Sequence, residues 1–179
     1  MPSELEVLGI VSDRLSAAGI SFMLTGSFAL AFYATPRMTR DLDFVVALKA
    51  QDVATLIAAF APDFYVDHDS AASAVAAERL FNLMHLESGI KVDFIVQKSA
   101  EYRQVEFARR KQVSLGGFTT WIVSCEDLIL SKLVWARESA SEMQRRDIAL
   151  LLAQSPDLEY IRLWAPRLGV GAILDGIKP

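Results

Sequence analysis

Two aspartates interrupt an otherwise hydrophobic run, "DLDFVVAL", at residues 41–48. A short apolar run of this kind predicts a buried strand. Because side chains alternate along a strand, Asp41 and Asp43 share one face with Val45, while apolar side chains fill the other face. Two like charges held side by side in a folded interior cost free energy unless a cation or hydrogen-bond donors compensate. The run therefore predicts a sheet strand whose polar face binds something.

A third carboxylate stands in a second strand-like run, "IKVDFIV". Here Asp93 shares a face with Lys91. If this strand neighbours the first one, three carboxylates converge and repel one another unless a cation neutralises them. Mg²⁺ suits such oxygen donors, and paired Mg²⁺ ions can hold both reacting oxygens of a phosphoryl-type displacement. In the alternative interpretation, Asp93 is a charge on an edge strand with Lys91 as its neighbour.

A Gly-Ser pair precedes the first two aspartates. Gly26 and Ser27 follow a short predicted strand, "SFMLTG", and open a predicted helix, "SFALAFYA". Without a Cβ, the backbone N–H groups there can approach a phosphate closely, and a helix N-terminus favours negative charge. A phosphate cradle beside a metal-binding acid cluster describes a nucleoside triphosphate site.

The remaining pattern predicts an α+β core followed by helices. Helical spacing marks "SELEVLGIVSDRLSAAGI", with Leu5, Leu8, Val11 and Leu15 as its apolar positions, and also "AQDVATLIAAFA". Two hairpins are predicted, one turning at Ser88-Gly89 and one inside "RKQVSLGGFTTWIVS". Ser124 is a predicted helix N-cap, and "CEDLILSKLVWARESASEMQRRDIALLLAQ" and "DLEYIRLWAPRLG" follow as helices. We expect residues 1–123 to form a mixed, twisted β-sheet flanked by helices. Residues 124–179 then form a helical segment packed on it as a single compact unit.

Composition narrows the class of protein. The 179 residues carry a formal net charge of -4 and are 53% hydrophobic, which suits one globular domain with a real core. The one cysteine, Cys125, excludes an intramolecular disulfide and fits a reducing compartment. We expect no membrane span and no secretory signal, and hence a cytoplasmic protein. The acidity argues against a broad nucleic-acid footprint.

The stretch "LTGSFALAFYATPRMTRDLDFVV", followed by "VDFIV", resembles the nucleotidyltransferase superfamily of the DNA polymerase beta type. That signature is Gly-Gly or Gly-Ser, a short spacer, Asp-x-Asp, and a third Asp on a later strand. Within the superfamily, the chain is most similar to small bacterial proteins related to AbiEii-type toxins and to aminoglycoside nucleotidyltransferases. The later "EDLILSKLVWARES" and "QRRDIALLL" resemble the helical segment of those proteins.

The resemblance implies roles for individual residues. The implied metal-ligating and catalytic residues are Asp41, Asp43 and Asp93, where Asp93 completes the metal site or acts as general base. The implied nucleotide-binding residues are Gly26, Ser27, Arg37, Arg40 and Lys132, and Asp147 is a weaker candidate. The implied cofactor is Mg²⁺, or Mn²⁺ in its place, with a nucleoside triphosphate as donor substrate.

The implied function is Mg²⁺-dependent transfer of a nucleoside monophosphate to a hydroxyl of a small molecule, a protein or an RNA. The alternative is a catalytically silent module that binds a cognate partner protein in a toxin–antitoxin or defence pair. A basic face beside the site would favour an RNA acceptor, and acidic or apolar walls would favour a small one.

Some of these residues also have a purely structural interpretation. Lys132 lies in an apolar helix and could reach the surface along its own stem. Asp147 fits an exposed helix face, which is the interpretation we favour for it. Arg37 and Arg40 could be surface charges of a loop.

Overall fold

The structure is a computed structural model that describes residues 2–35, 41–139 and 141–177. The chain divides into two compact units. Unit 1 comprises Met1–Phe28 and Met38–Val123, and unit 2 comprises Ala29–Arg37 and Ser124–Pro179. The expected packing of residues 124–179 on the core as a single compact unit stays a prediction.

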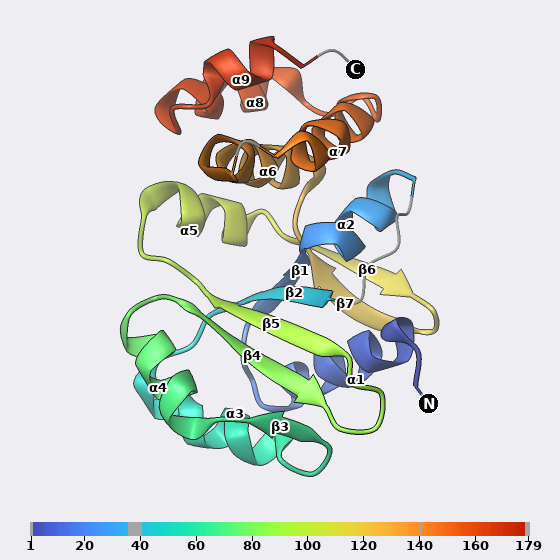
Figure 1. Cartoon of the computed structure of the whole chain (residues 1–179), viewed down its shortest axis with the longest axis vertical. Coiled ribbons are helices and arrows are strands. Elements are labelled where there is room, and N and C mark those ends of the chain that lie inside the picture. The colour runs from blue at the N-terminus through green and yellow to red at the C-terminus, as the bar shows by residue number, and fades with distance from the viewer. Residues whose placement is uncertain (1, 36–40, 140, 178–179) are drawn as a thin grey trace. The chain divides into compact units, whose positions relative to one another are not determined.

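Within the described residues, seven strands of unit 1 form one mixed sheet in the order β3-β4-β5-β2-β1-β7-β6 (Figure 1). Their bounds are β1 Phe22–Thr25, β2 Asp41–Val46, β3 Phe64–Val66, β4 Leu80–His85, β5 Lys91–Val96, β6 Lys111–Leu115 and β7 Phe118–Ile122. Strand β2 is parallel to β5 and antiparallel to β1, and β4 is antiparallel to β5 and β3. The mixed sheet flanked by helices, predicted from the sequence, is confirmed.

Four α-helices and one 3₁₀ helix of the described residues lie wholly in unit 1. They are α1 Glu4–Ala17, η1 Ala50–Asp52, α3 Val53–Phe60, α4 His68–Ala76 and α5 Glu101–Ala108. Helix α1 begins at a capping box, in which Ser3 and Glu6 satisfy each other's backbone N–H groups. Its buried positions include the predicted Leu8, Val11 and Leu15, but Leu5 is exposed and Val7 is buried instead. The apolar stripe therefore differs from the predicted one at its start.

The core of unit 1 lies on the face of the sheet opposite to Asp41 and Asp43. Leu42, Phe44 and Val46 of β2 are buried there, as strand alternation requires. Phe44 packs edge-to-face on Phe94 of β5, with ring centroids 6.1 Å apart. Burying each such side chain contributes about 1.5–3 kcal/mol. This packing fixes the register of β2 and β5 and so turns their aspartates to the opposite face.

Unit 2 is helical throughout its described elements. Helix α2, Gly26–Tyr33, starts in unit 1, and its residues from Ala29 onward belong to unit 2. The other helices are α6 Cys125–Ser139, α7 Glu142–Leu152, α8 Leu158–Arg167 and α9 Gly171–Asp175. The predicted N-cap is present, because Ser124 Oγ accepts a hydrogen bond from the Asp127 N–H at 3.1 Å.

The long helix predicted after Ser124 is instead two helices, α6 and α7. Helix α6 ends at Ser139, and Ser141 caps α7 by accepting from the Gln144 N–H at 3.4 Å. Serine side chains compete for backbone hydrogen bonds, which makes them good caps and poor interior residues of a helix. The apolar periodicity continues across this break, so the spacing alone did not reveal it.

Four short elements were not predicted: β3, α4, α5 and α9. Helix α4 is rich in alanine and serine, so it shows little apolar periodicity. It is defined instead by its cap, because the Asp67 carboxylate accepts from the Ser70 N–H at 2.7 Å. Strand β3 has three residues, too few for an alternation pattern to be read.

Candidate functional site

The three predicted acids lie on one face of the sheet, which we call the carboxylate face and define by Asp41, Asp43 and Asp93. In the parallel pair β2–β5, Asp43 is directly opposite Asp93, and Asp41 is directly opposite Lys91. Residues directly opposite each other in a sheet project to the same side. Strand β5 lies between β2 and β4, so the interpretation of Asp93 as an edge-strand charge is wrong.

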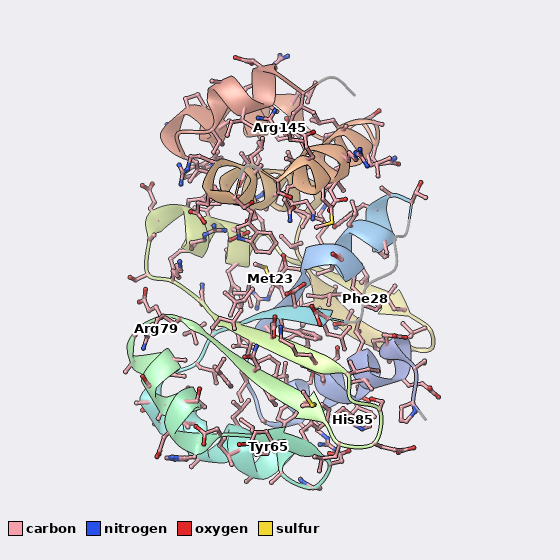
Figure 2. The ribbon with its side chains drawn as sticks, viewed as in Figure 1. Met23, Phe28, Tyr65, Arg79, His85 and Arg145 are labelled. Carbon is pink, nitrogen blue, oxygen red and sulfur yellow. The ribbon has the colours of Figure 1, made fainter. Side chains whose placement is uncertain are left out.

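The register extends this arrangement into two rows of side chains across neighbouring strands. The first row is Asn82, Asp93, Asp43 and Thr25, on β4, β5, β2 and β1. The second row is Tyr65, Met84, Lys91 and Asp41, on β3, β4, β5 and β2. Tyr65 and Met84 are exposed, and Figure 2 labels Tyr65, which belongs to the edge strand β3. Polar side chains therefore flank Asp43 and Asp93 in one row, and Lys91 separates Asp41 from the exposed Met84 and Tyr65 in the other.

Asp93 has a partner at each carboxylate oxygen. Lys91 Nζ lies 2.9 Å from Asp93 Oδ2, and Asn82 Nδ2 donates to Asp93 Oδ1. The hydrogen bond to Asp93 raises the pKa of Lys91, although partial burial opposes the rise. The negative charges of Asp93, Asp41 and Asp43 raise this pKa further. The ammonium of Lys91 therefore interacts electrostatically with all three carboxylates.

Gly26 fits closely against Asp43. Its φ is +66°, a left-handed conformation that side chains other than glycine rarely adopt. A Cβ at this position would overlap Asp43 Oδ2 and would lie 2.7 Å from Asp43 Cγ. The absence of a side chain thus lets the start of α2 approach the carboxylate, and the adjoining Ser27 is buried. The helix N-terminus adds a partial positive charge at this place.

The donor chemistry of the carboxylate face suits Mg²⁺, which prefers carboxylate oxygens. A lysine ammonium already pairs with Asp93, and the charges of all three acids raise its pKa, so the face favours positive charge. In the part of the chain that the structure describes, no three His, Cys, Asp or Glu side chains are arranged to hold a metal ion as they stand. The three aspartates have the ligand chemistry that Mg²⁺ requires, and their side chains lie on the same face of the sheet. The ammonium of Lys91 would have to move away from Asp93 to make room for the ion.

The remaining predicted residues lie elsewhere. Arg37 and Arg40 fall outside the described residues. Lys132 lies in unit 2, where its Nζ is 2.7 Å from Asp147 Oδ2 and 3.2 Å from Gln144 Oε1. The side chains of Lys132 and Asp147 are 1% and 4% exposed. Lys132 therefore does not reach the surface along its stem, and Asp147 is not on an exposed helix face; both of those interpretations are wrong. The implied contact of Lys132 with the triphosphate stays a prediction.

Asn82 is the site neighbour that the sequence reasoning missed. Alternation along "LFNLMH" puts Asn82 on the same face as Leu80 and Met84. The hairpin at Ser88-Gly89 was predicted, but its register was not, and the register alone puts Asn82 opposite Asp93. One signal was available, because Asn82 is the one polar residue between Leu80 and Met84.

Comparison with known families decides the class of this chain. The profile of the family described as "Nucleotidyl transferase AbiEii toxin, Type IV TA system" matches residues 10–162. The chain belongs to the AbiEii family. The match covers the glycine turn, the three acids and the helices of unit 2 as far as α8. The AbiEii family is one of type IV toxin–antitoxin systems.

Solved structures with the same fold are also nucleotidyltransferase-like. An antigenic nucleotidyltransferase-like protein from Paracoccidioides brasiliensis matches with TM-score 0.59 and 18% identity, over 98% of this chain and 93% of that one. The antibiotic-resistance factor ANT(2'')-Ia matches with TM-score 0.61 and 12% identity, over 97% and 95% of the two chains. The lincomycin-bound lincosamide antibiotic adenylyltransferase LnuA matches with TM-score 0.56 and 14% identity, over 82% and 95%.

A comparison with curated proteins gave no match. Among the described residues of this AbiEii-family chain, none of the helices has the length and apolar character needed to span a membrane.

Proposed function

We propose that this AbiEii-family chain transfers a nucleoside monophosphate from a nucleoside triphosphate to an acceptor hydroxyl, with the carboxylate face as its active site. The observation that carries the proposal is the register of β2 and β5, which sets Asp43 opposite Asp93 beside a glycine that must lack a side chain. Family membership and the adenylyltransferase activity named for a structural relative support the same reaction class.

The strand order separates the side of the carboxylate face where the phosphates would bind from the side where the acceptor would approach. The start of α2 follows β1, on one side of Asp43, and β4 lies beyond Asp93 on the other side. We propose that the β- and γ-phosphates rest at Gly26 and Ser27. In an in-line displacement the acceptor attacks opposite the leaving group. The acceptor hydroxyl then approaches from the β4 side, where Asn82 and the exposed Met84 lie.

In the proposed reaction, every bond formed or broken and the transferred proton can be assigned. The acceptor oxygen forms a bond to the α-phosphorus, the bond from that phosphorus to the oxygen bridging to the β-phosphate breaks, and pyrophosphate leaves. Asp93 takes the proton of the acceptor hydroxyl. Asp41 and Asp43 would hold Mg²⁺, which when bound supplies neutralisation of the phosphate charge. The buried aromatic packing behind β2 and β5 keeps these carboxylates in place, so that positioning does much of the catalysis.

One observation favours the alternative of a silent, partner-binding module. The ion pair between Lys91 and Asp93 is the arrangement expected where a carboxylate serves structure rather than chemistry. In that case the chain would act through a cognate partner protein, as a member of a type IV toxin–antitoxin family. Labelling experiments separate the two functions.

The test is incubation of the protein with each α-labelled nucleoside triphosphate, Mg²⁺ and a cell extract, followed by fractionation of the label. We expect one fraction to gain label and Asp43→Asn to lower the labelling rate by at least about 100-fold, because a metal-ligating charge is lost. Asp13→Asn is the matched control, since Asp13 is an exposed aspartate on α1. Equal labelling by the Asp43→Asn variant, or no labelling with any triphosphate, would end the proposal.

A further inference from the structure

Lys91 occupies a position where the proposed reaction requires a different cation. Its ammonium lies 2.9 Å from Asp93 Oδ2, and Asn82 holds the other oxygen of the same carboxylate. Asp41, on the neighbouring strand β2, lies directly opposite Lys91. The three acids therefore have a counter-charge built into the chain itself.

Among the described residues, the acids share one face without forming a ready metal site. An ammonium 2.9 Å from Asp93 Oδ2 takes up part of the acceptor capacity of this carboxylate and repels a divalent ion that approaches it. The pair is accessible, because the side chain of Lys91 is 39% exposed and that of Asp93 is 11% exposed. The lysine end of the pair lies at the surface, where water and other cations can replace the ammonium.

We infer that Lys91 is a positioning residue that holds Asp93 in the metal-free protein and competes with a divalent cation for the carboxylate face. The ammonium then opposes divalent cation binding at Asp41 and Asp43 for as long as Lys91 stays at Asp93. The triphosphate aids this exchange, because it brings the metal with it and offers the displaced ammonium a new anion. The free protein consequently binds divalent ions weakly, and metal enters together with the nucleotide. This inference rests on the proposed function for the identity of the metal site, but its test needs no nucleotide.

The test measures Mn²⁺ binding to the whole chain, without nucleotide, by titration with electron paramagnetic resonance of the free ion. We expect Lys91→Met to bind Mn²⁺ at least about tenfold more tightly than the parent, because a positive charge a few ångströms from the ion has been removed. Lys91→Arg keeps the charge and should stay within about twofold of the parent. The double variant Lys91→Met with Asp93→Asn should lose the gain, which assigns the bound ion to this face.

Lys111→Met is the matched control for the change in net charge. Lys111 is also the first residue of a strand and is exposed, but β6 is separated from β2 by β1 and β7. Three strand spacings amount to about 14 Å, beyond the screening length at physiological salt. We therefore expect Lys111→Met to bind Mn²⁺ as the parent does.

An affinity of Lys91→Met within twofold of the parent would overturn the inference. So would loss of the native melting transition in both Lys91→Met and Lys91→Gln, because the pair would then be a fixed part of the fold. Tighter Mn²⁺ binding by Lys91→Met in a protein that labels no acceptor would support the inference and end the proposed transferase function. Labelling by the parent, with unchanged Mn²⁺ affinity in Lys91→Met, would do the reverse.

Discussion

Among the described residues, the pairs Lys91–Asp93 and Lys132–Asp147 lie in very different surroundings. In unit 1, Lys91 lies 2.9 Å from Asp93, and the two side chains are 39% and 11% exposed. In unit 2, Lys132 lies 2.7 Å from Asp147, and both side chains are almost wholly buried. The two pairs use the same groups at nearly the same distance and differ strongly in their exposure to solvent.

Burial decides whether such a pair can be exchanged. Removing one partner of a buried pair leaves an uncompensated charge away from water, which costs about 3–5 kcal/mol. An exposed pair loses little when broken, since water and salt replace the partner. The Lys132–Asp147 pair is therefore a fixed link between α6 and α7, and the Lys91–Asp93 pair is replaceable. A site in which a metal ion is to take the place of an ammonium needs a replaceable pair.

The largest expected effect concerns the buried pair. We expect Lys132→Met to lower the free energy of unfolding by about 3–5 kcal/mol, because Asp147 stays buried without its ammonium partner. Urea unfolding followed by circular dichroism measures this change. The double variant Lys132→Met with Asp147→Leu should return to within about 1 kcal/mol of the parent. A single variant as stable as the parent would show that the pair is not a fixed link.

The second prediction concerns the room beside Asp43. Gly26→Ala should lower the free energy of unfolding by roughly 2–4 kcal/mol, from the strain of a positive φ together with overlap on Asp43. Gly19 has nearly the same φ, +68°, and a Cβ added there would meet no atom within 4 Å. Gly19→Ala should therefore show the backbone strain alone, roughly 1 kcal/mol. Equal losses for the two variants, measured by urea unfolding, would remove the argument for a tight fit at Gly26.

The smallest expected effect is that of the Lys91–Asp93 pair, whose lysine is partly exposed, on stability. Lys91→Met should lower the free energy of unfolding by no more than about 1 kcal/mol at low ionic strength. The loss should shrink in about 1 M NaCl, where the screening length falls to about 3 Å. The loss in Lys132→Met should persist under the same conditions, since burial excludes the salt. Salt-insensitive losses in both variants would mean that the two pairs do not differ as proposed.

Many strands and helix starts could be predicted because their signals are local. Alternation along residues 41–48 and 90–96 indicated both strands and the face of each aspartate. The Gly-Ser pair marked the start of α2, and Ser124 marked the start of α6. These signals depend on backbone geometry over a few residues, which a single sequence displays directly.

The parts that could not be predicted depend on partners distant in the chain. The position of Asn82 opposite Asp93 follows from the register of the β4–β5 hairpin. That register depends on the turn geometry, which the amino-acid sequence of residues 86–90 does not determine. The burial of Lys132 and Asp147 depends on how α6 and α7 pack on each other, across a break that the apolar spacing concealed. A charged residue in an apolar helix has the same sequence pattern whether it reaches water or finds a buried partner.

The parallel pairing of β2 with β5 has a consequence for how the protein folds during its synthesis. Asp43 and Asp93 meet although many residues and several elements lie between them in the chain. Contacts between distant parts of a sequence form late, because the intervening chain must first give up its freedom. During synthesis, a nascent polypeptide that ends before β5 carries two of the aspartates without the third. A ribosome-bound fragment of this kind therefore lacks Asp93, and the carboxylate face is complete only after the β2–β5 crossover has folded.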